Sequence, residues 1–286
     1  AEVISLLGAI PEFVDIDSET FNIDISQLEE KFENNPGKYK VVIPVNIFGL
    51  AADYIELNKL KEKYSFKVIE DAAQSFGASI NGKMSCTFGD INCTSFYPAK
   101  PLGCYGDGGA IFTDDENYKD ILCSIRVHGQ GKDKYSNIRL GINGRLDTIQ
   151  AAILIPKLKI LNNEISSRNK IADQYNKKLN GQFKTQSITE GYESAWAQYS
   201  LLCNSRIHRY EVISNLSKNN IPSAIYYKIP LHLQKAFQGL GYQVGDFPIA
   251  EDISKRILSL PMHPYLSVGD VDNICDIVME KKTYEV

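Results

Sequence analysis

The amino-acid sequence predicts an α/β fold built on a mixed sheet that is covered by helices. Strand-like apolar runs alternate with amphipathic helical runs along most of the 286 residues, which is the pattern of a sheet packed between helices. Residues 91–113 predict a strand, a glycine-rich loop with one lysine, and a second strand. The strand-like run 66–71 ends in the carboxylates Glu70 and Asp71, at the edge where sheets of this kind bind ligands.

The first half of the chain supplies most of the predicted sheet. Residues 1–9 predict an amphipathic helix that stops near Gly8. Short apolar runs or period-2 alternation predict strands, and apolar residues at three- and four-residue spacing predict helices. The predicted strands are 11–17, 40–45, 66–71 and 91–96, and the predicted helices are 26–33 and 53–64.

The second half leads from this sheet into a smaller domain. Asp115 is the expected cap of a helix over 115–129, and Pro156 is expected to kink a long helix over 147–179. That helix is predicted to connect a large domain, residues 1–165, to a smaller α+β domain, residues 166–286. The remaining predicted elements are strands 108–113, 196–203, 223–227 and 260–262, a polar loop at 129–145, a helix at 209–220 and two further helices after it.

Composition and charge exclude several classes of function. The formal net charge is −4, which indicates neither a polyanion nor a membrane surface as a partner. The sequence holds no apolar run long enough for a transmembrane helix and no signal-peptide pattern. Six cysteines lack CxxC spacing and four histidines lack metal-ligand spacing, so we expect reduced thiols, a cytoplasmic location and no metal site.

The loop around Lys100 is the first candidate site. Pro98 and Pro101 bracket this lysine and stiffen the backbone on both sides of it. Glycines at 103, 106, 108 and 109 allow sharp turns immediately afterwards. A stiffened loop with a single ammonium group suits a lysine that must reach a ligand. On local sequence alone, a solvated surface lysine is the alternative.

Asp71 is the second candidate, because it follows a short apolar strand. The chemistry that needs one lysine and one carboxylate, both on strand ends, is pyridoxal phosphate catalysis. The lysine binds the cofactor covalently, and the carboxylate keeps the pyridine nitrogen protonated. The alternative for Asp71 is a helix N-cap over residues 72–74.

Four motifs in a fixed order resemble the DegT/DnrJ/EryC1/StrS sugar aminotransferases. They are EDAAQSFGA (70–78), SFYPAKPLGCYGDGGAIFT (95–113), RVHGQ (126–130) and GINGRLDTIQAA (141–152). The resemblance extends over nearly the whole chain, and it implies a fold-type I enzyme with pyridoxal 5'-phosphate as cofactor. Within the family, PLGCYGDGGA and NGRLDTIQAAIL look most like enzymes that aminate C3 of UDP-2-acetamido-2-deoxy-3-oxo-glucuronate.

The resemblance assigns the cofactor-binding positions. It makes Lys100 the lysine that binds the cofactor and Asp71 the partner of the pyridine nitrogen. Gln74 matches a residue near the ring oxygen, and Ser95 matches a phosphate-binding hydroxyl. Asn143 matches a residue that reaches the phosphate from the neighbouring subunit, although a left-handed turn residue before Gly144 is the local alternative. Dehydrating relatives carry histidine in place of this lysine, so its presence favours transamination.

Four further residues are candidates for substrate binding. The guanidinium of Arg145 suits a carboxylate of glutamate or of a uronic acid, and an ion pair with Asp147 is its alternative. The Tyr226-Tyr227 pair lies where glucuronate-type relatives often have His-Tyr, so Tyr226 leaves the exact sugar open. His232 also matches a family position, although structural hydrogen bonding would explain it. Asn46 is a second departure from the family pattern, because many relatives have a histidine or a serine at this position.

The resemblance also implies partners and a reaction. Glutamate and a nucleotide-linked keto sugar would be the substrates, and the amino group would pass between them in two half-reactions. If Asn143 and Arg145 act across a subunit interface, the active unit is a homodimer with shared sites. A 4-keto sugar and a dTDP-linked 3-keto-6-deoxy sugar are alternatives. Because relatives have a phosphate-binding Gly-Thr turn before the position of Ala1, the given chain is expected to lack N-terminal elements and part of that site. A truncated, non-catalytic relative is therefore the remaining alternative.

Overall fold

A computed structural model describes residues 1–133 and 135–280, which divide into two compact units. The unit that we call the sheet unit comprises Pro36–Ser166 and Thr189–Ala197. The unit that we call the terminal unit comprises Ala1–Asn35, Ser167–Ile188 and the residues from Gln198 on. This grouping unites the first 35 residues with the C-terminal part of the chain, and the division into domains 1–165 and 166–286 stays a prediction.

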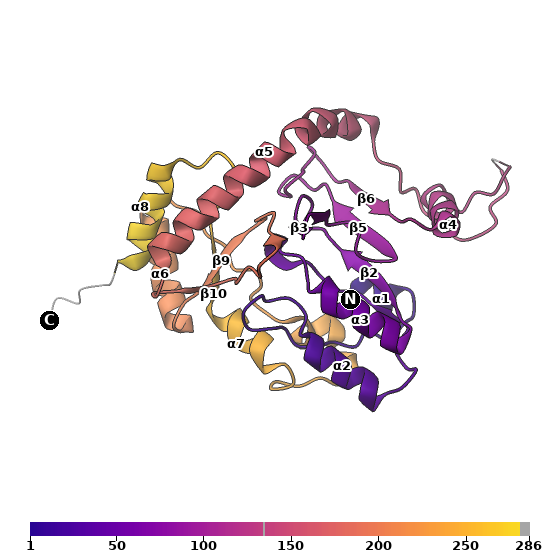
Figure 1. Cartoon of the computed structure of the whole chain (residues 1–286), viewed down its shortest axis with the longest axis horizontal. Coiled ribbons are helices and arrows are strands. Elements are labelled where there is room, and N and C mark those ends of the chain that lie inside the picture. The colour runs from indigo at the N-terminus through magenta and orange to yellow at the C-terminus, as the bar shows by residue number, and fades with distance from the viewer. Residues whose placement is uncertain (134, 281–286) are drawn as a thin grey trace. The chain divides into compact units, whose positions relative to one another are not determined.

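The sheet unit is built on a four-stranded mixed sheet (Figure 1). The strands lie in the order β1 (Val41–Val42), β2 (Lys67–Asp71), β5 (Ile91–Ser95) and β6 (Gly109–Phe112). The pairs β1–β2 and β2–β5 are parallel, whereas β6 runs antiparallel to β5. The first three strands therefore end at the same edge, and the mixed α/β sheet predicted from the sequence is confirmed.

Capped helices complete the sheet unit. Helix α3 (Tyr54–Tyr64) begins at Asp53, whose carboxylate accepts hydrogen bonds from two backbone N–H groups, and α4 (Glu116–Arg126) begins in the same way at Asp115. The start of α5 (Thr148–Leu179) also belongs to this unit, and Pro156 lies inside it. The smaller elements are the short helix η1 (Ile47–Gly49) and the strands β3 (Ser79–Ile80), β4 (Lys83–Met84) and β8 (Tyr192–Glu193).

The terminal unit has an antiparallel sheet of its own, in the order β10 (Ile257–Leu260), β9 (Tyr199–Leu202) and β7 (Lys184–Thr185). Every residue of β9 and β10 is buried, as expected for strands covered on both faces. This confirms the α+β character predicted for the C-terminal part. Its helical elements are α1 (Glu2–Leu6), α2 (Ile25–Asn34), α6 (Arg206–Lys218), η2 (Leu231–Leu233), η3 (Lys235–Leu240), α7 (Pro248–Arg256) and α8 (Val268–Met279).

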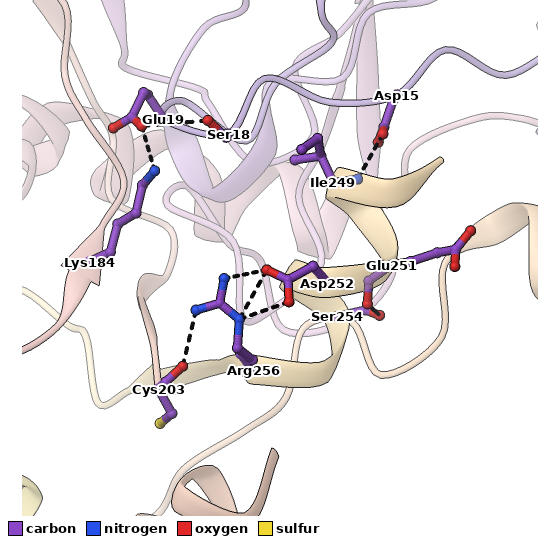
Figure 2. A network of polar contacts seen from close by, with 10 residues as sticks. All are labelled: Asp15, Ser18, Glu19, Lys184, Cys203, Ile249, Glu251, Asp252, Ser254 and Arg256. Carbon is purple, nitrogen blue, oxygen red and sulfur yellow. Dashed lines mark hydrogen bonds and ion pairs between the residues drawn. The ribbon is translucent and has the colours of Figure 1, made fainter. Parts of the chain in front are cut away.

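Polar contacts attach the N-terminal segment to this unit, as Figure 2 shows. The carboxylate of Asp15 accepts hydrogen bonds from the N–H groups of Ile249 and Ala250, both at 2.9 Å, and so caps the start of α7. Glu19 pairs with Lys184 at the edge of the sheet. The Asp15 contacts satisfy backbone donors at the start of α7, which would otherwise lack partners.

Several predicted boundaries were wrong, most of all in strands. Among the helices, those predicted at 115–129 and 209–220 span Glu116–Arg126 and Arg206–Lys218 instead. Residues 11–17 form only one bridge, between Ile16 and Ile23, because Asp15 is used in capping α7. Residues 223–227 likewise form only the bridge between Ala224 and Ser259. The strand predicted at 260–262 lies at Ile257–Leu260, and that predicted at 40–45 is reduced to Val41–Val42 with a bridge at Val45.

Candidate active site

The ends of β2 and β5 create the candidate site in the sheet unit. Asp71 is the last residue of β2 and Ser95 is the last residue of the parallel strand β5. The chain then leaves both strands at the same edge of the sheet, where ligands of open α/β sheets bind. The N–H of Ala72 donates to the carbonyl of Cys93 at 2.8 Å, which ties the two departing segments together.

Asp71 is held by its backbone and by its side chain. Its N–H donates to the Pro44 carbonyl and its carbonyl accepts from the Asn46 N–H, both at 3.0 Å. Its carboxylate accepts a hydrogen bond from the N–H of Ala73 at 3.1 Å. The residues after it form a turn rather than a helix, so Asp71 caps a turn and the helix N-cap expected as its alternative does not form.

Lys100 is half-buried and lies within electrostatic reach of Asp71. Burial lowers the pKa of the Lys100 ammonium, and the negative charge of Asp71 acts in the opposite direction. The Lys100 N–H donates to the carbonyl of Tyr97 at 2.9 Å, which keeps the backbone turned at this point. The structure therefore brings together the lysine and the carboxylate that the sequence singled out, and the half-burial of Lys100 disfavours the fully solvated surface lysine that was its alternative.

Gln74 and Ser95 lie on the same segments as these two residues. Gln74 is buried, and its Oε1 accepts a hydrogen bond from the Phe48 N–H at 2.6 Å. The Oγ of Ser95 accepts one from the Tyr97 N–H at 3.2 Å. Their roles toward a ring oxygen and a phosphate remain predictions, but both side chains stand next to the strand ends.

A buried polar network behind Asp71 was missed by the sequence analysis. Glu70 is fully buried, and its carboxylate accepts hydrogen bonds from the side chains of Asn46 (2.9 Å) and Ser85 (2.7 Å). It also accepts from the backbone N–H groups of Cys86 (2.9 Å) and Phe88 (3.0 Å). The signal was available: a carboxylate inside an apolar strand must find donors, and Asn46 already stood out as a departure from the family.

Asn46 joins this network to the start of α3. Its Oδ1 accepts hydrogen bonds from the Ala52 N–H and the Tyr54 hydroxyl, both at 3.0 Å. Burial, followed by the charge of Glu70, raises the pKa of the Tyr54 hydroxyl, so Tyr54 stays a neutral donor. Asn46 thus fixes, by backbone and side chain, the strand end from which Asp71 projects.

Asn143 and Arg145 lie on the exposed loop that precedes α5. The Nε of Arg145 donates to the Oδ1 of Asn143 at 3.0 Å, and Asn143 pairs by a backbone bridge with Val127. The loop geometry therefore joins these two predicted residues to each other, with Arg145 paired to Asn143 instead of the Asp147 considered from sequence.

The other predicted substrate-binding residues belong to the terminal unit. Tyr226 and Tyr227 are exposed, with ring centroids 5.5 Å apart. His232 is buried, and its Nε2 lies 3.0 Å from the Oε1 of Glu251. Glu251 also accepts a hydrogen bond from the Gly245 N–H at 2.7 Å. These contacts agree with the structural role that was the alternative for His232, and substrate binding by all three residues stays a prediction.

The donors at the strand ends fit pyridoxal phosphate. Lys100 supplies an amine whose pKa is lowered by burial, Asp71 supplies a fixed carboxylate, and Ser95 supplies a hydroxyl at the end of the adjacent strand. In the part of the chain that the structure describes, no group of three or more histidine, cysteine or acidic side chains could hold a metal ion. None of the helices described there is both long and apolar enough to cross a bilayer.

A mixed α/β sheet with a half-buried lysine in the electrostatic range of a strand-end carboxylate is the arrangement that a fold-type I, pyridoxal phosphate-dependent enzyme needs. The model of the DegT/DnrJ/EryC1/StrS aminotransferase family matches residues 1–279. The chain therefore belongs to this family of sugar aminotransferases and is a pyridoxal phosphate-dependent aminotransferase. The predicted family, fold type, enzyme class and cofactor are thereby confirmed.

Individual relatives agree with this assignment. The chain is 43% identical over 276 residues to UDP-2-acetamido-2-deoxy-3-oxo-D-glucuronate aminotransferase of Pseudomonas aeruginosa, covering 96% of this chain and 74% of the relative. It is 37% identical over 277 residues to dTDP-3-amino-3,6-dideoxy-alpha-D-galactopyranose transaminase of Aneurinibacillus thermoaerophilus, covering 96% and 74%.

Solved structures show the same similarity. A DegT DnrJ EryC1 StrS aminotransferase from Brucella abortus superposes with a TM-score of 0.91 at 46% identity, covering 97% of this chain and 75% of that one. The PMP form of a sugar aminotransferase from Streptococcus pneumoniae gives a TM-score of 0.89 at 26% identity, covering 97% and 77%. The chain thus spans about three quarters of the length of these relatives.

Proposed function

We propose that this enzyme transfers the amino group of glutamate to C3 of a UDP-linked 2-acetamido-3-keto-glucuronate, as a step toward a polysaccharide or glycan precursor. The proposal is carried by the similarity to the Pseudomonas aeruginosa aminotransferase, which is named for the 3-oxo-glucuronate sugar. A dTDP-linked 3-keto-6-deoxy sugar is the second candidate, favoured by the 37% identity to the Aneurinibacillus thermoaerophilus transaminase.

The roles of the two central residues follow from their surroundings. Lys100 would hold the cofactor through its Nζ, and its neutral amine would move a proton at the α-carbon of the amino donor. Because burial lowers the pKa of Lys100, more of the amine is neutral, and only the neutral form is a nucleophile or a base. Asp71 keeps a proton on the ring nitrogen of the cofactor, which when bound supplies the electron sink for the reaction.

The remaining predicted residues bind the phosphate and the substrates in this proposal. Gln74 and Ser95 contact the cofactor, and Asn143 reaches the phosphate across a subunit interface. Arg145 donates to Asn143 through Nε, and the rest of its guanidinium carries further donors that suit a carboxylate. Tyr226, Tyr227 and His232 are proposed to contact the sugar nucleotide from the terminal unit.

A cytoplasmic homodimer with shared active sites is part of the proposal. The loop that carries Asn143 and Arg145 exposes large apolar side chains, which in a monomer would face water. The exposed fractions are 61% for Ile138, 98% for Leu140 and 64% for Ile142, and Ile149 in the adjoining first turn of α5 is 73% exposed. A second copy of the chain would cover these side chains and bring Asn143 to the partner's cofactor.

The test is a direct comparison of keto sugars. Purified protein loaded with pyridoxal phosphate is mixed with glutamate and, separately, with the UDP-linked 3-keto-glucuronate, a dTDP-linked 3-keto-6-deoxy sugar and a UDP-linked 4-keto sugar. Mass spectrometry then measures the aminated product and 2-oxoglutarate. We expect the first sugar to be aminated with the highest kcat/KM, with parallel double-reciprocal plots, and no product from Lys100→Ala.

The outcomes separate the candidates. Preference for the dTDP-linked or 4-keto sugar would replace the proposed substrate while keeping the reaction class. Failure to aminate any sugar, together with failure to retain the cofactor, would favour the non-catalytic alternative for this chain.

A further inference from the structure

The lysine loop (residues 97–108) is held from outside by two polar side chains of α5. The Nζ of Lys157 donates to the Gly103 carbonyl at 2.6 Å. The Oε1 of Gln150 accepts a hydrogen bond from the Tyr105 N–H at 2.8 Å. The Lys157 ammonium also lies 4.9 Å from the centroid of the Tyr105 ring, within the range of a cation–π contact.

The same loop packs its apolar side chains against α5. Leu102 and Cys104 are buried in a cluster that includes Leu154, Leu161 and Ile165 of that helix. The Cys104 N–H donates to the Phe96 carbonyl at 2.8 Å and closes the loop at its base. The polar and apolar contacts therefore act on one short segment that begins only two residues after Lys100.

Two glycines show how closely the loop fits. A Cβ on Gly103 would lie 2.5 Å from the Pro98 carbonyl oxygen, and one on Gly106 would lie 2.9 Å from the Nε2 of Gln150. The backbone of Pro98 leaves no room for a side chain at position 103, whereas a side chain at position 106 would have to displace the end of the Gln150 side chain. The loop therefore lies in close contact both with its own backbone and with Gln150.

We propose that Gln150 and Lys157 are positioning residues that hold the lysine loop against α5 and so fix the place from which Lys100 reaches its ligand. The catalytic meaning of this role rests on the proposed function, because it requires Lys100 to be the reacting amine. The contacts of Gln150 and Lys157 with the lysine loop are present in the protein without ligand. Neither residue was singled out by the sequence analysis.

The restraint has a consequence for the Lys100 amine. Burial lowers the pKa of Lys100, and the facing charged group, Asp71, partly opposes this effect. A loop released from α5 would admit water to Lys100. Its pKa would then rise toward the ordinary value for lysine, and less of the amine would be neutral at a given pH.

Amide hydrogen exchange of the unliganded protein tests the restraint. Lys157→Met keeps the length of the side chain but removes the donor, and Gln150→Met removes the acceptor. We expect exchange at Cys104 and Tyr105 to become about tenfold faster in Lys157→Met and about fivefold faster in Gln150→Met. Lys157→Arg should restore slow exchange, because a guanidinium can donate to the same carbonyl and stack on the tyrosine ring.

The matched control is Lys159→Met, which removes an exposed lysine two residues along the same helix and should leave exchange in the loop unchanged. Thermal unfolding of each variant separates local opening from global destabilisation. Unchanged exchange in both test variants, with unfolding midpoints equal to that of the parent protein, would overturn the proposal. Equal acceleration in the control would overturn it as well.

A second readout follows the amine itself. The rate of Lys100 acetylation by acetic anhydride, measured against pH by peptide mass spectrometry, should show a higher midpoint in Lys157→Met and Gln150→Met than in the parent. Unchanged midpoints would contradict the positioning role. The variants could show faster amide exchange and a shifted acetylation midpoint although the parent protein aminates no sugar. That result would support the positioning role of Gln150 and Lys157 and refute the proposed function, so the failure of one proposal can be told from the failure of the other.

Discussion

At the scale of single residues, we expect Asp71 to have two separable effects, one on the ring of the bound cofactor and one on Lys100. Its negative charge raises the pKa of Lys100 against the lowering effect of burial. Asp71→Asn keeps the size of the side chain and removes the charge. We therefore expect the pKa of Lys100 to fall further, whereas kcat should drop by about 100-fold or more because the ring proton is no longer held.

These effects are measured in the same variant. The pH dependence of Lys100 acetylation reports the pKa, and steady-state kinetics report kcat. Asp114→Asn, which changes an exposed aspartate of the same unit, is the control. A kcat close to that of the parent protein would contradict the role given to Asp71.

The sequence motifs predicted the candidate site residues. The local sequence did not predict the buried residues that hold those candidates in place. Lys100 and Asp71 were found because the prolines, the glycines and the strand ends around them are local in sequence. Glu70 was missed as a buried group because its donors, such as Asn46 and Ser85, come from distant segments. The same reason hid Lys157, which meets Gly103 only after the chain has folded.

At the scale of elements, the network around Glu70 holds the ends of β1 and β2 together. Asn46→Ala removes one donor to a fully buried carboxylate and two acceptor contacts that serve α3. We expect this change to reduce the free energy of unfolding by about 3 kcal/mol. Urea unfolding followed by circular dichroism measures it.

Glu62→Gln is the matched control for this prediction. It changes an exposed side chain on α3 and should alter the free energy of unfolding by less than about 0.5 kcal/mol. A loss in Asn46→Ala no larger than in this control would mean that the network contributes nothing measurable.

A close backbone approach beside η1 offers a second test at this scale. Gly49 has φ of +108°, and a Cβ there would lie 2.6 Å from the Trp196 nitrogen and 2.8 Å from the Ala197 nitrogen. Gly37 also has positive φ, +73°, but a Cβ there would meet nothing within 4 Å. Both glycines have positive φ, but only at Gly49 would a Cβ meet backbone atoms.

Gly49→Ala is therefore expected to destabilise the protein by about 3 kcal/mol or more, because backbone must move. Gly37→Ala should cost only about 1 kcal/mol, the cost of a left-handed conformation for alanine. Thermal unfolding of the two variants measures the difference. An equal loss of stability in Gly49→Ala and Gly37→Ala would show that the close backbone approach at Gly49 does not determine the cost of the substitution.

Helices were easier to predict than strands for a physical reason. The helices α2, α3 and α4 carry their caps and apolar stripes within their own sequence. A strand instead needs a partner that the local pattern does not specify. Residues 11–17 have the alternation of a strand, but Asp15 caps α7 and the N–H of Phe13 donates to the Tyr242 hydroxyl.

At the scale of the whole molecule, the proposed dimer predicts a change in oligomeric state. Leu140→Asp places a charge on the most exposed apolar side chain of the loop before α5. We expect the dissociation constant of the dimer to rise by about 30-fold or more, as measured by sedimentation velocity. Affinity for pyridoxal phosphate should fall in parallel, because Asn143 would no longer reach the partner's site.

Ile55→Asp is the control for the dimer. Ile55 is 45% exposed on α3, away from that loop in sequence, and the same charge there should leave the dissociation constant unchanged. A parent protein that sediments as a monomer at all concentrations would exclude the shared site.

The six thiols of the chain differ sharply in their surroundings. Cys123, on α4, is exposed, whereas Cys86, Cys104, Cys203 and Cys275 are buried and Cys93 is half-buried. Burial raises the pKa of Cys86 to about 12 and that of Cys275 to about 11, so their thiolates are scarce at neutral pH. A maleimide dye should consequently attach to Cys123 first, which gives fluorescence measurements a single reporter without any engineered substitution.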